Sequence, residues 1–291
     1  MGLSKRLETI VSMVPELGPE GCVADVGTDH GFVPIRLVEL GLCGRALAMD
    51  VRPGPLERAR EHIRQHGLES RIETRLGDGL EQLRPGEAQA VVIAGMGGEL
   101  MLRILKEGAH VRGQVAHWIL SPQSELSQFR HGLEEMGLCI REESMILEDG
   151  KYYTVLDVIP GEMHYQREYQ YRYGNCLIRK NSPVLREFLE REMEKNRRIR
   201  ERLESLGGED HGNRQEFPGD EGNRLESQEG EGIRQESESG NENRRKSGVR
   251  GETERRKREL EQEYEEMEAA YDAMQGCDWE AGGAGTPETG L

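Results

Sequence analysis

The residues best suited to chemistry gather in one short stretch, Val23-Ala-Asp-Val-Gly-Thr-Asp-His-Gly31. An apolar run from Cys22 to Val26 carries the acid Asp25 and ends at Gly27, and an amphipathic segment begins at Phe32. This pattern predicts a buried strand that turns sharply into a helix, where glycines allow torsions and close approach that a Cβ would block. The start of the helix offers free N–H groups. A ligand with a ribose, an adenine and a carboxylate fits such a turn, and so does an ordinary strand-loop-helix connection that binds nothing.

Two further acids stand at or just after the ends of later apolar runs. Asp50 ends the run Gly44–Asp50, 25 residues after Asp25, and an acid there can accept hydrogen bonds from both ribose hydroxyls. The alternative role for Asp50 is to cap the next helix. Asp78 lies within Gly77-Asp-Gly79, placed for an adenine ring or for a plain turn, because Asp-Gly is a common turn pair.

A glycine-rich segment, Gly95-Met-Gly-Gly98, follows the apolar run that begins at Ala90. Three glycines in four residues suggest that the backbone approaches a ligand closely. Met96 would contact an apolar ligand face or, as is commoner for methionine, fill the core. Gly95, Met96 and Gly97 are therefore candidate cofactor contacts.

The hydrophobic pattern around these residues alternates between strand and helix periods. Helices are expected over 3–14, from Phe32, over 58–66 and over 126–136, and strands over 22–26, 44–50, 71–76, 90–94, 117–121, 138–147 and 151–159. The last two strands form a hairpin around Asp149-Gly150. This order predicts a doubly wound α/β sheet whose last strand is antiparallel. It fits the Rossmann-like, seven-stranded class I methyltransferase domain, with S-adenosylmethionine at the carboxyl ends of strands one and two.

The composition of the chain limits the partners and the cellular compartment that we expect for this protein. The chain has 291 residues and a formal net charge of −16, so no global field draws it to nucleic acid or membrane, and any polyanion site must be a local patch. Five widely spaced cysteines without a Cys-x-x-Cys pair favour reduced thiols over disulfides or a zinc site. No apolar run approaches about 18 residues and no secretory h-region stands at the start, so we expect a cytoplasmic protein without membrane contact.

Several local motifs coincide in a way typical of one known family. They are Leu3-Ser-Lys-Arg-Leu7, Asp25-Val-Gly-Thr-Asp-His30, Gly77-Asp-Gly79, Ile93-Ala-Gly-Met-Gly-Gly98 and Glu148-Asp-Gly-Lys-Tyr-Tyr153. Together they resemble the bacterial tRNA (adenine(22)-N(1))-methyltransferases, over residues 1 to 206 and more loosely over 251 to 275. The resemblance implies an enzyme that uses S-adenosylmethionine to methylate an adenine in the D-loop region of tRNA. We expect this enzyme to be a monomer. Thr28 stands where the family usually has Ser, which keeps the hydroxyl.

The chemistry of this reaction suggests roles for residues within the predicted site. Adenine N1 has an in-plane lone pair and needs no prior deprotonation, but its product is cationic, so a nearby carboxylate would stabilise it. Many amino-methyltransferases carry an Asp or Asn after strand four, where this chain has only Gly95–Gly98. Asp29 is therefore the candidate catalytic acid and His30 the second candidate. Alternatively, both cap the next helix or bind the amino-acid end of the cofactor. The expected cofactor contacts are Asp25, Gly27, Thr28, Asp29, Asp50, Asp78, Gly79, Gly95, Met96 and Gly97.

The remainder of the chain predicts a helical arm. Residues 164–206 hold eleven Lys/Arg against seven Asp/Glu, a net of +4, densest at 195–202. Five residues, Leu260, Tyr264, Met267, Tyr271 and Met274, follow a heptad spacing. We expect 1–160 to form the cofactor-binding domain, and 161–206 with 251–276 an antiparallel, coiled-coil-like helical domain. Its basic face would contact tRNA phosphates, or would simply be a solvated surface.

The segment between the two helices is a degenerate ten-residue repeat, with copies starting at Gly212, Gly222 and Gly232. It is polar and glycine-rich, so 207–250 is expected to be a disordered insertion, and 277–291 a disordered tail. Two alternatives to a tRNA methyltransferase stay open. One is an S-adenosylmethionine-dependent enzyme of a small molecule or protein, and the other is a non-catalytic RNA-binding module on the same scaffold.

Overall fold

The computed structural model describes residues 3–208 and 238–276. They fall into two compact units, one of Met1–Leu189 with Ala269–Leu291 and one of Glu190–Glu268. No helix in the described ranges is both long and apolar enough to span a membrane. The four cysteines within those ranges are free thiols.

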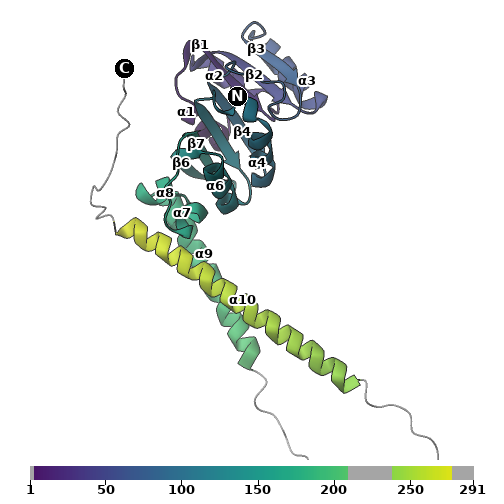
Figure 1. Cartoon of the computed structure of the whole chain (residues 1–291), viewed down its shortest axis with the longest axis vertical. Coiled ribbons are helices and arrows are strands. Elements are labelled where there is room, and N and C mark those ends of the chain that lie inside the picture. Colours follow the sequence, from purple (N-terminus) through teal and green to yellow (C-terminus); the bar gives the residue numbers. More distant parts are fainter. Residues whose placement is uncertain (1–2, 209–237, 277–291) are drawn as a thin grey trace, which may run out of the picture. The chain divides into compact units, whose positions relative to one another are not determined.

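The first unit is built on a seven-stranded sheet with helices on both faces (Figure 1). Its strands are β1 (Gly18–Val26), β2 (Cys43–Asp50), β3 (Ile72–Leu76), β4 (Ala90–Met96), β5 (His117–Pro122), β6 (Leu138–Glu148) and β7 (Lys151–Pro160). Their order is β3-β2-β1-β4-β5-β7-β6. β7 is antiparallel to both of its neighbours, β5 and β6, and the other neighbouring pairs are parallel. The predicted Rossmann-like sheet with an antiparallel last strand is therefore confirmed.

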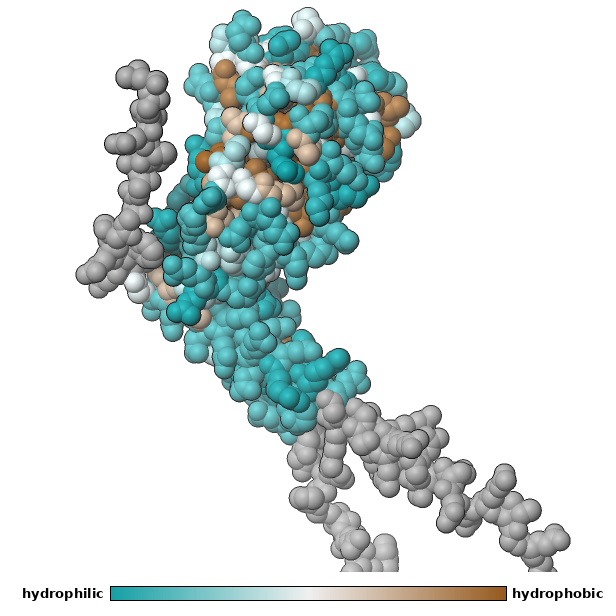
Figure 2. All heavy atoms as spheres, viewed as in Figure 1, coloured by the Kyte–Doolittle hydropathy of each residue, from teal (hydrophilic) through white to brown (hydrophobic). Residues whose placement is uncertain are grey.

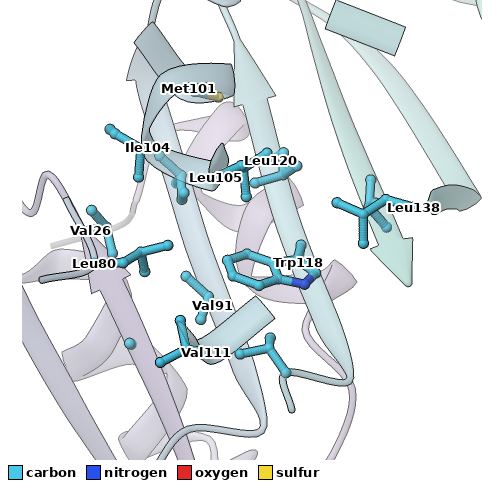
Figure 3. Close-up of a cluster of buried hydrophobic side chains, with 14 of the residues drawn as sticks. Val26, Leu80, Val91, Met101, Ile104, Leu105, Val111, Trp118, Leu120 and Leu138 are labelled. Atoms are coloured by element: carbon cyan, nitrogen blue, oxygen red, sulfur yellow. The ribbon is translucent and has the colours of Figure 1, made fainter. Parts of the chain in front are cut away.

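Buried apolar side chains fill both faces of this sheet, because successive side chains of a strand point to opposite faces. In β4, Val91 and Ile93 belong to one cluster, while Ala90 and Val92 belong to the other. Figure 3 shows the first cluster, in which Trp118 of β5 lies among aliphatic side chains from the neighbouring strands and helices. This two-sided burial explains why the central strands are continuous apolar runs rather than alternating ones.

Three helices contribute to each face. The helices α1 (Lys5–Met13), α2 (Phe32–Glu39) and α3 (Pro53–Gln65) supply the second cluster, and α4 (Gly98–Glu107), α5 (Ala109–Arg112) and α6 (Leu126–Glu135) supply the first. Pro53 begins α3, since proline is favoured in the first helical turn, and the predicted segment 58–66 forms the later part of this helix. The sequence analysis also missed α4, since the glycines that open it suggested only a loop.

The first unit extends beyond residue 160, where the sequence analysis ended the domain. After β7, the short helices α7 (Glu168–Tyr173) and α8 (Asn175–Arg179) belong to the same unit. Arg130 of α6 and Glu143 of β6 form a buried ion pair at 2.9 Å. Arg130 also donates to the Tyr171 carbonyl at 2.6 Å. These long-range contacts fasten α7 to the sheet, and no local sequence pattern indicates them.

The second unit takes its residues from α9 (Pro183–Gly208) and α10 (Glu238–Gln275), which run in opposite directions (Figure 1). Buried Asn196 donates from Nδ2 to the Leu260 carbonyl at 2.9 Å. The Arg200 guanidinium lies 5.5 Å from the centre of the Tyr264 ring. The visible face of these helices is mostly hydrophilic (Figure 2). A helical C-terminal region is thus confirmed, while its coiled-coil character stays a prediction.

The start of α10 corrects one prediction. Residues 238–250 were expected within the disordered insertion, but they are helical and continuous with the rest of α10. The polar composition that suggested disorder is also compatible with a solvated helix. The remainder of the predicted disorder, at 209–237 and 277–291, lies outside the described residues.

Candidate active site

The candidate site lies where the strand order reverses. β2 flanks β1 on one side and β4 flanks it on the other, all parallel, so their carboxyl ends meet at one edge of the sheet. Ligands of open α/β sheets bind at such a switch point. A cavity of about 460 Å³ opens there, lined by Arg6, Leu7, Asp25, Gly27, Asp29, His30, Phe32, Val33, Asp50, Arg52, Ala94, Gly95, Met96 and Gln123.

A second cavity, of about 340 Å³, adjoins the first. It is lined by Val26, Gly27, Asp50, Val51, Arg52, Gly77, Asp78, Gly79, Met96, Leu100, Arg103 and Ile104. Both cavities share Gly27, Asp50, Arg52 and Met96, so they form one elongated cleft. We refer to the part that holds Asp29 as the first pocket and the part that holds Asp78 as the second pocket.

Two buried carboxylates line the cleft, Asp25 in the first pocket and Asp50 at the junction of the two pockets. Asp25 is 7% exposed and Asp50 is 6% exposed. Burial raises the pKa of Asp25 to about 6, with the Thr28 hydroxyl opposing the rise and the charge of Asp50 adding to it. Asp50 accepts a hydrogen bond from the Arg52 backbone N–H at 2.7 Å, and the Arg52 Nε lies 3.7 Å away. Paired acids of this kind are suited to bind hydroxyl or ammonium groups of a ligand.

The turn after β1 brings the backbone of Gly27 close to Met96 at the end of β4, on the opposite side of the cleft. Gly27 has φ +81°, and a Cβ there would lie 2.1 Å from the Met96 Cε. The backbone N–H groups of Gly27 and Thr28 both donate to the Met49 carbonyl at 2.8 Å, which ties the turn to the end of β2. Gly95, at the end of β4, also has a positive φ, +79°. Glycine is thus required by conformation on both sides of the cleft.

Asp29 is held at the mouth of the first pocket by two cationic or polar neighbours. Its Oδ1 accepts from the Arg58 guanidinium at 2.8 Å and lies 3.5 Å from the His30 Nε2. The N-cap of α2 is Gly31, without any side-chain capping bond. Neither Asp29 nor His30 therefore caps the helix with its side chain, and the Asp29 carboxylate is 61% exposed.

Most of the predicted site residues come together along this cleft. Asp25, Gly27, Asp29, His30, Asp50, Gly95 and Met96 line the first pocket, and Gly27, Asp50, Asp78, Gly79 and Met96 line the second. Thr28 and Gly97 line neither. Thr28 is buried behind the turn, and Gly97 is the N-cap of α4, where a Cβ would lie 3.1 Å from the Ser124 Oγ.

Other residues of the cleft were not predicted from the sequence. Arg6, Phe32, Arg52 and Gln123 line the first pocket, and Val51 and Leu100 line the second. The Arg6 guanidinium lies 5.2 Å from the centre of the Tyr153 ring. Both residues belong to motifs that carried the family resemblance, which was the one available indication of their proximity.

Comparisons with known proteins agree with this geometry. A family model described as a methyltransferase domain matches residues 3–156. The tRNA (adenine(22)-N(1))-methyltransferase of Bacillus subtilis is 36% identical over 160 residues, which are 55% of this chain and 66% of that protein, just under two thirds of its length.

Solved structures extend the similarity over nearly the whole chain. The structure of the B. subtilis M1A22 tRNA methyltransferase has a TM-score of 0.68 at 25% identity, covering 93% of this chain and 99% of that one. A Streptococcus pneumoniae protein in complex with S-adenosyl-L-methionine is 36% identical, with a TM-score of 0.64, covering 71% of this chain and 95% of that one. The chain belongs to the methyltransferase-domain family, within the group that contains the tRNA (adenine(22)-N(1))-methyltransferases.

Proposed function

We propose that this protein transfers the methyl group of S-adenosylmethionine to N1 of adenine 22 in the D-loop region of tRNA. The observation that carries the proposal is the cleft at the β1–β4 switch point, which is built from the same motifs that resemble the tRNA methyltransferases. The relative of B. subtilis named for this activity matches the chain at 36% identity.

The cleft has the chemistry to bind the cofactor. In the second pocket, Val51 and Leu100 are 57% and 40% exposed and offer apolar surface to an adenine ring, with Asp78 beside them. Asp50 at the junction would accept from the ribose hydroxyls. Asp25, Gly27 and Gly95 would hold the amino-acid end, and a Cβ at Gly27 would meet the Met96 Cε on the opposite side of the cleft.

The protein's part in the reaction is positioning and electrostatics. The bound cofactor supplies an electrophilic methyl group, and the acceptor nitrogen must be held in line with it at about 3–3.5 Å. Asp29 would accept a hydrogen bond from the exocyclic amine and stabilise the positive charge that develops on the adenine. Arg58 donates a hydrogen bond to the Asp29 carboxylate and would restrain it, so little reorganisation would be needed when the charge appears. His30 would orient Asp29.

The helical arm would supply the backbone contacts. On α9, an exposed stripe carries Arg191, Lys195, Arg198 and Arg202 at helical spacing. Lys195 and Arg198 are paired with glutamates of the same helix, while neither Arg191 nor Arg202 has a carboxylate partner among the described residues. Such unpaired cations are suited to phosphates. We further propose a monomeric, cytoplasmic enzyme.

The direct test is methyl transfer from labelled S-adenosylmethionine to an unmodified tRNA transcript, followed by identification of the modified nucleoside. We expect N1-methyladenosine, and no incorporation into a matched transcript with guanine at position 22. If the protein binds S-adenosylmethionine but labels neither RNA, the acceptor is a protein or small molecule instead. If it binds no S-adenosylmethionine, the result supports the alternative of a non-catalytic RNA-binding module.

A further inference from the structure

Three aromatic rings form a cluster on the wall of the first pocket. The ring centroids of His30, Phe32 and His62 are 5.3 Å apart in each pair, with interplanar angles of 7°, 20° and 21°. His30 comes from the turn after β1, Phe32 is the first residue of α2, and His62 comes from α3. Neither Phe32 nor His62 has a role in the site as described so far.

A specific hydrogen bond holds this cluster together. The His62 Nδ1 lies 2.9 Å from the His30 carbonyl oxygen, and because a carbonyl only accepts, the Nδ1 must carry the hydrogen. His30 has φ +64° and Gly31 has φ +68°. A left-handed residue other than glycine is costly and is kept only where its surroundings impose it. The hydrogen bond from His62 restrains the peptide that follows His30, and so helps to hold the turn that leads into Phe32.

The Phe32 ring presents an apolar surface to the cleft. The residue is 37% exposed and lines the first pocket together with Asp29 and His30. Single exposed apolar residues are ordinary on protein surfaces, but this one is backed by two further rings at a pocket beside a carboxylate. A flat ligand that stacks there would bury the Phe32 ring while its polar edge remains within reach of Asp29.

We propose that Phe32, supported by His30 and His62, is the surface on which the target adenine stacks. The inference rests on the proposed function and extends it to the acceptor site. The apolar surface of the second pocket, Val51 and Leu100, suits the adenine of the cofactor, so the ring at Phe32 receives the other base. Stacking is tolerant of base identity, since every base has a π-face. Phe32 would therefore bind the adenine and fix the plane of its ring, while Asp29 would accept a hydrogen bond from the exocyclic amine at the edge of that ring.

The test is a binding cycle with two RNAs and the full-length protein. One RNA is the unmodified tRNA transcript, and the other is the same transcript made abasic at position 22. We expect Phe32→Leu to weaken binding of the intact transcript about tenfold and to leave binding of the abasic transcript unchanged. Phe32→Tyr keeps the ring and should bind both RNAs like the wild type. Low salt keeps the abasic transcript measurably bound through its phosphates.

The controls separate stacking from a structural role. Because Phe32→Leu would remove only the ring contacts with His30 and His62, the variant should remain folded, with a melting temperature at most a few degrees lower, and should bind S-adenosylmethionine. An equal loss for both RNAs, or no loss for either, overturns the stacking proposal while leaving the proposed function intact. If the wild-type protein makes no N1-methyladenosine in tRNA, the proposed function itself fails, and that result is independent of the Phe32 cycle.

Discussion

At the scale of single residues, the buried carboxylate of Asp25 lowers the stability of the folded protein, although it is suited to bind the cofactor. The pKa of Asp25 is raised from its ordinary 3.8 to about 6, mainly by burial. The folded state therefore binds more protons than the unfolded state between these values, and the stability contributed by this group falls as the pH rises through that window. Above it, the buried charge costs up to about 3 kcal/mol.

Asp25→Asn removes that charge at every pH. We expect the variant without cofactor to be more stable than the wild type at pH 7.5, by about 1–3 kcal/mol, and to lose this advantage at pH 4. Its affinity for S-adenosylmethionine should fall, because the amide cannot replace the carboxylate. Denaturant unfolding at both pH values measures the first effect and calorimetry the second. Equal stability gains at pH 4 and pH 7.5 would contradict the assignment to charge burial.

Asp29 differs from Asp25 in being exposed and paired with Arg58. We expect Asp29→Ala to bind S-adenosylmethionine nearly as well as the wild type, because Asp25 and Asp50 remain. Its kcat should fall by about 10²-fold, the usual effect of removing one group that stabilises developing charge. Single-turnover methyl transfer with saturating tRNA measures this. Normal turnover would remove Asp29 from the mechanism.

At the scale of elements, the β1–α2 turn must leave the cleft open. Gly27→Ala introduces a Cβ that would meet the Met96 Cε, the mobile end of a side chain, so Met96 would move rather than the backbone. Gly41 is a matched control, since its φ is +72° and its surroundings are open. Both alanine variants should lose about 1 kcal/mol through backbone strain. Only Gly27→Ala should lose affinity for S-adenosylmethionine, by tenfold or more. Equal cofactor affinities in the two variants would show that the close contact is unimportant.

The same scale shows what the sequence could predict. Buried strands are continuous apolar runs, so the fold was predictable from the sequence. The glycines and acids that follow these runs mark one edge of the sheet, so the position of the cleft was predictable as well. Phe32 and Arg6 were not assigned to the cleft, because their relevant neighbours, His62 and Tyr153, are 30 or more residues away in the chain. The extent of the first unit depends in the same way on the buried pair of Arg130 and Glu143.

At the scale of the whole molecule, a chain of net charge −16 must bind a polyanion through local cations. Several basic residues among the described part of the arm are already paired with carboxylates. Arg197, for example, pairs with Glu194 at 2.8 Å and with Glu201 at 2.7 Å. Counting arginines therefore overstates the RNA-binding surface, and the cations without carboxylate partners in the described ranges matter more.

Arg191 and Arg202 are the cations of α9 on which this argument can be tested. We expect the double variant Arg191→Ala/Arg202→Ala to weaken tRNA binding and to reduce the slope of log affinity against log salt by about 2, one for each lost phosphate contact. The matched variant Arg191→Lys/Arg202→Lys keeps both charges and should retain the wild-type slope, since a phosphate accepts either cation. Affinity for S-adenosylmethionine should not change in either variant. An unchanged salt slope in the alanine variant would mean that tRNA binds through another surface, and the basic stripe of α9 would then be only a solvated helix face.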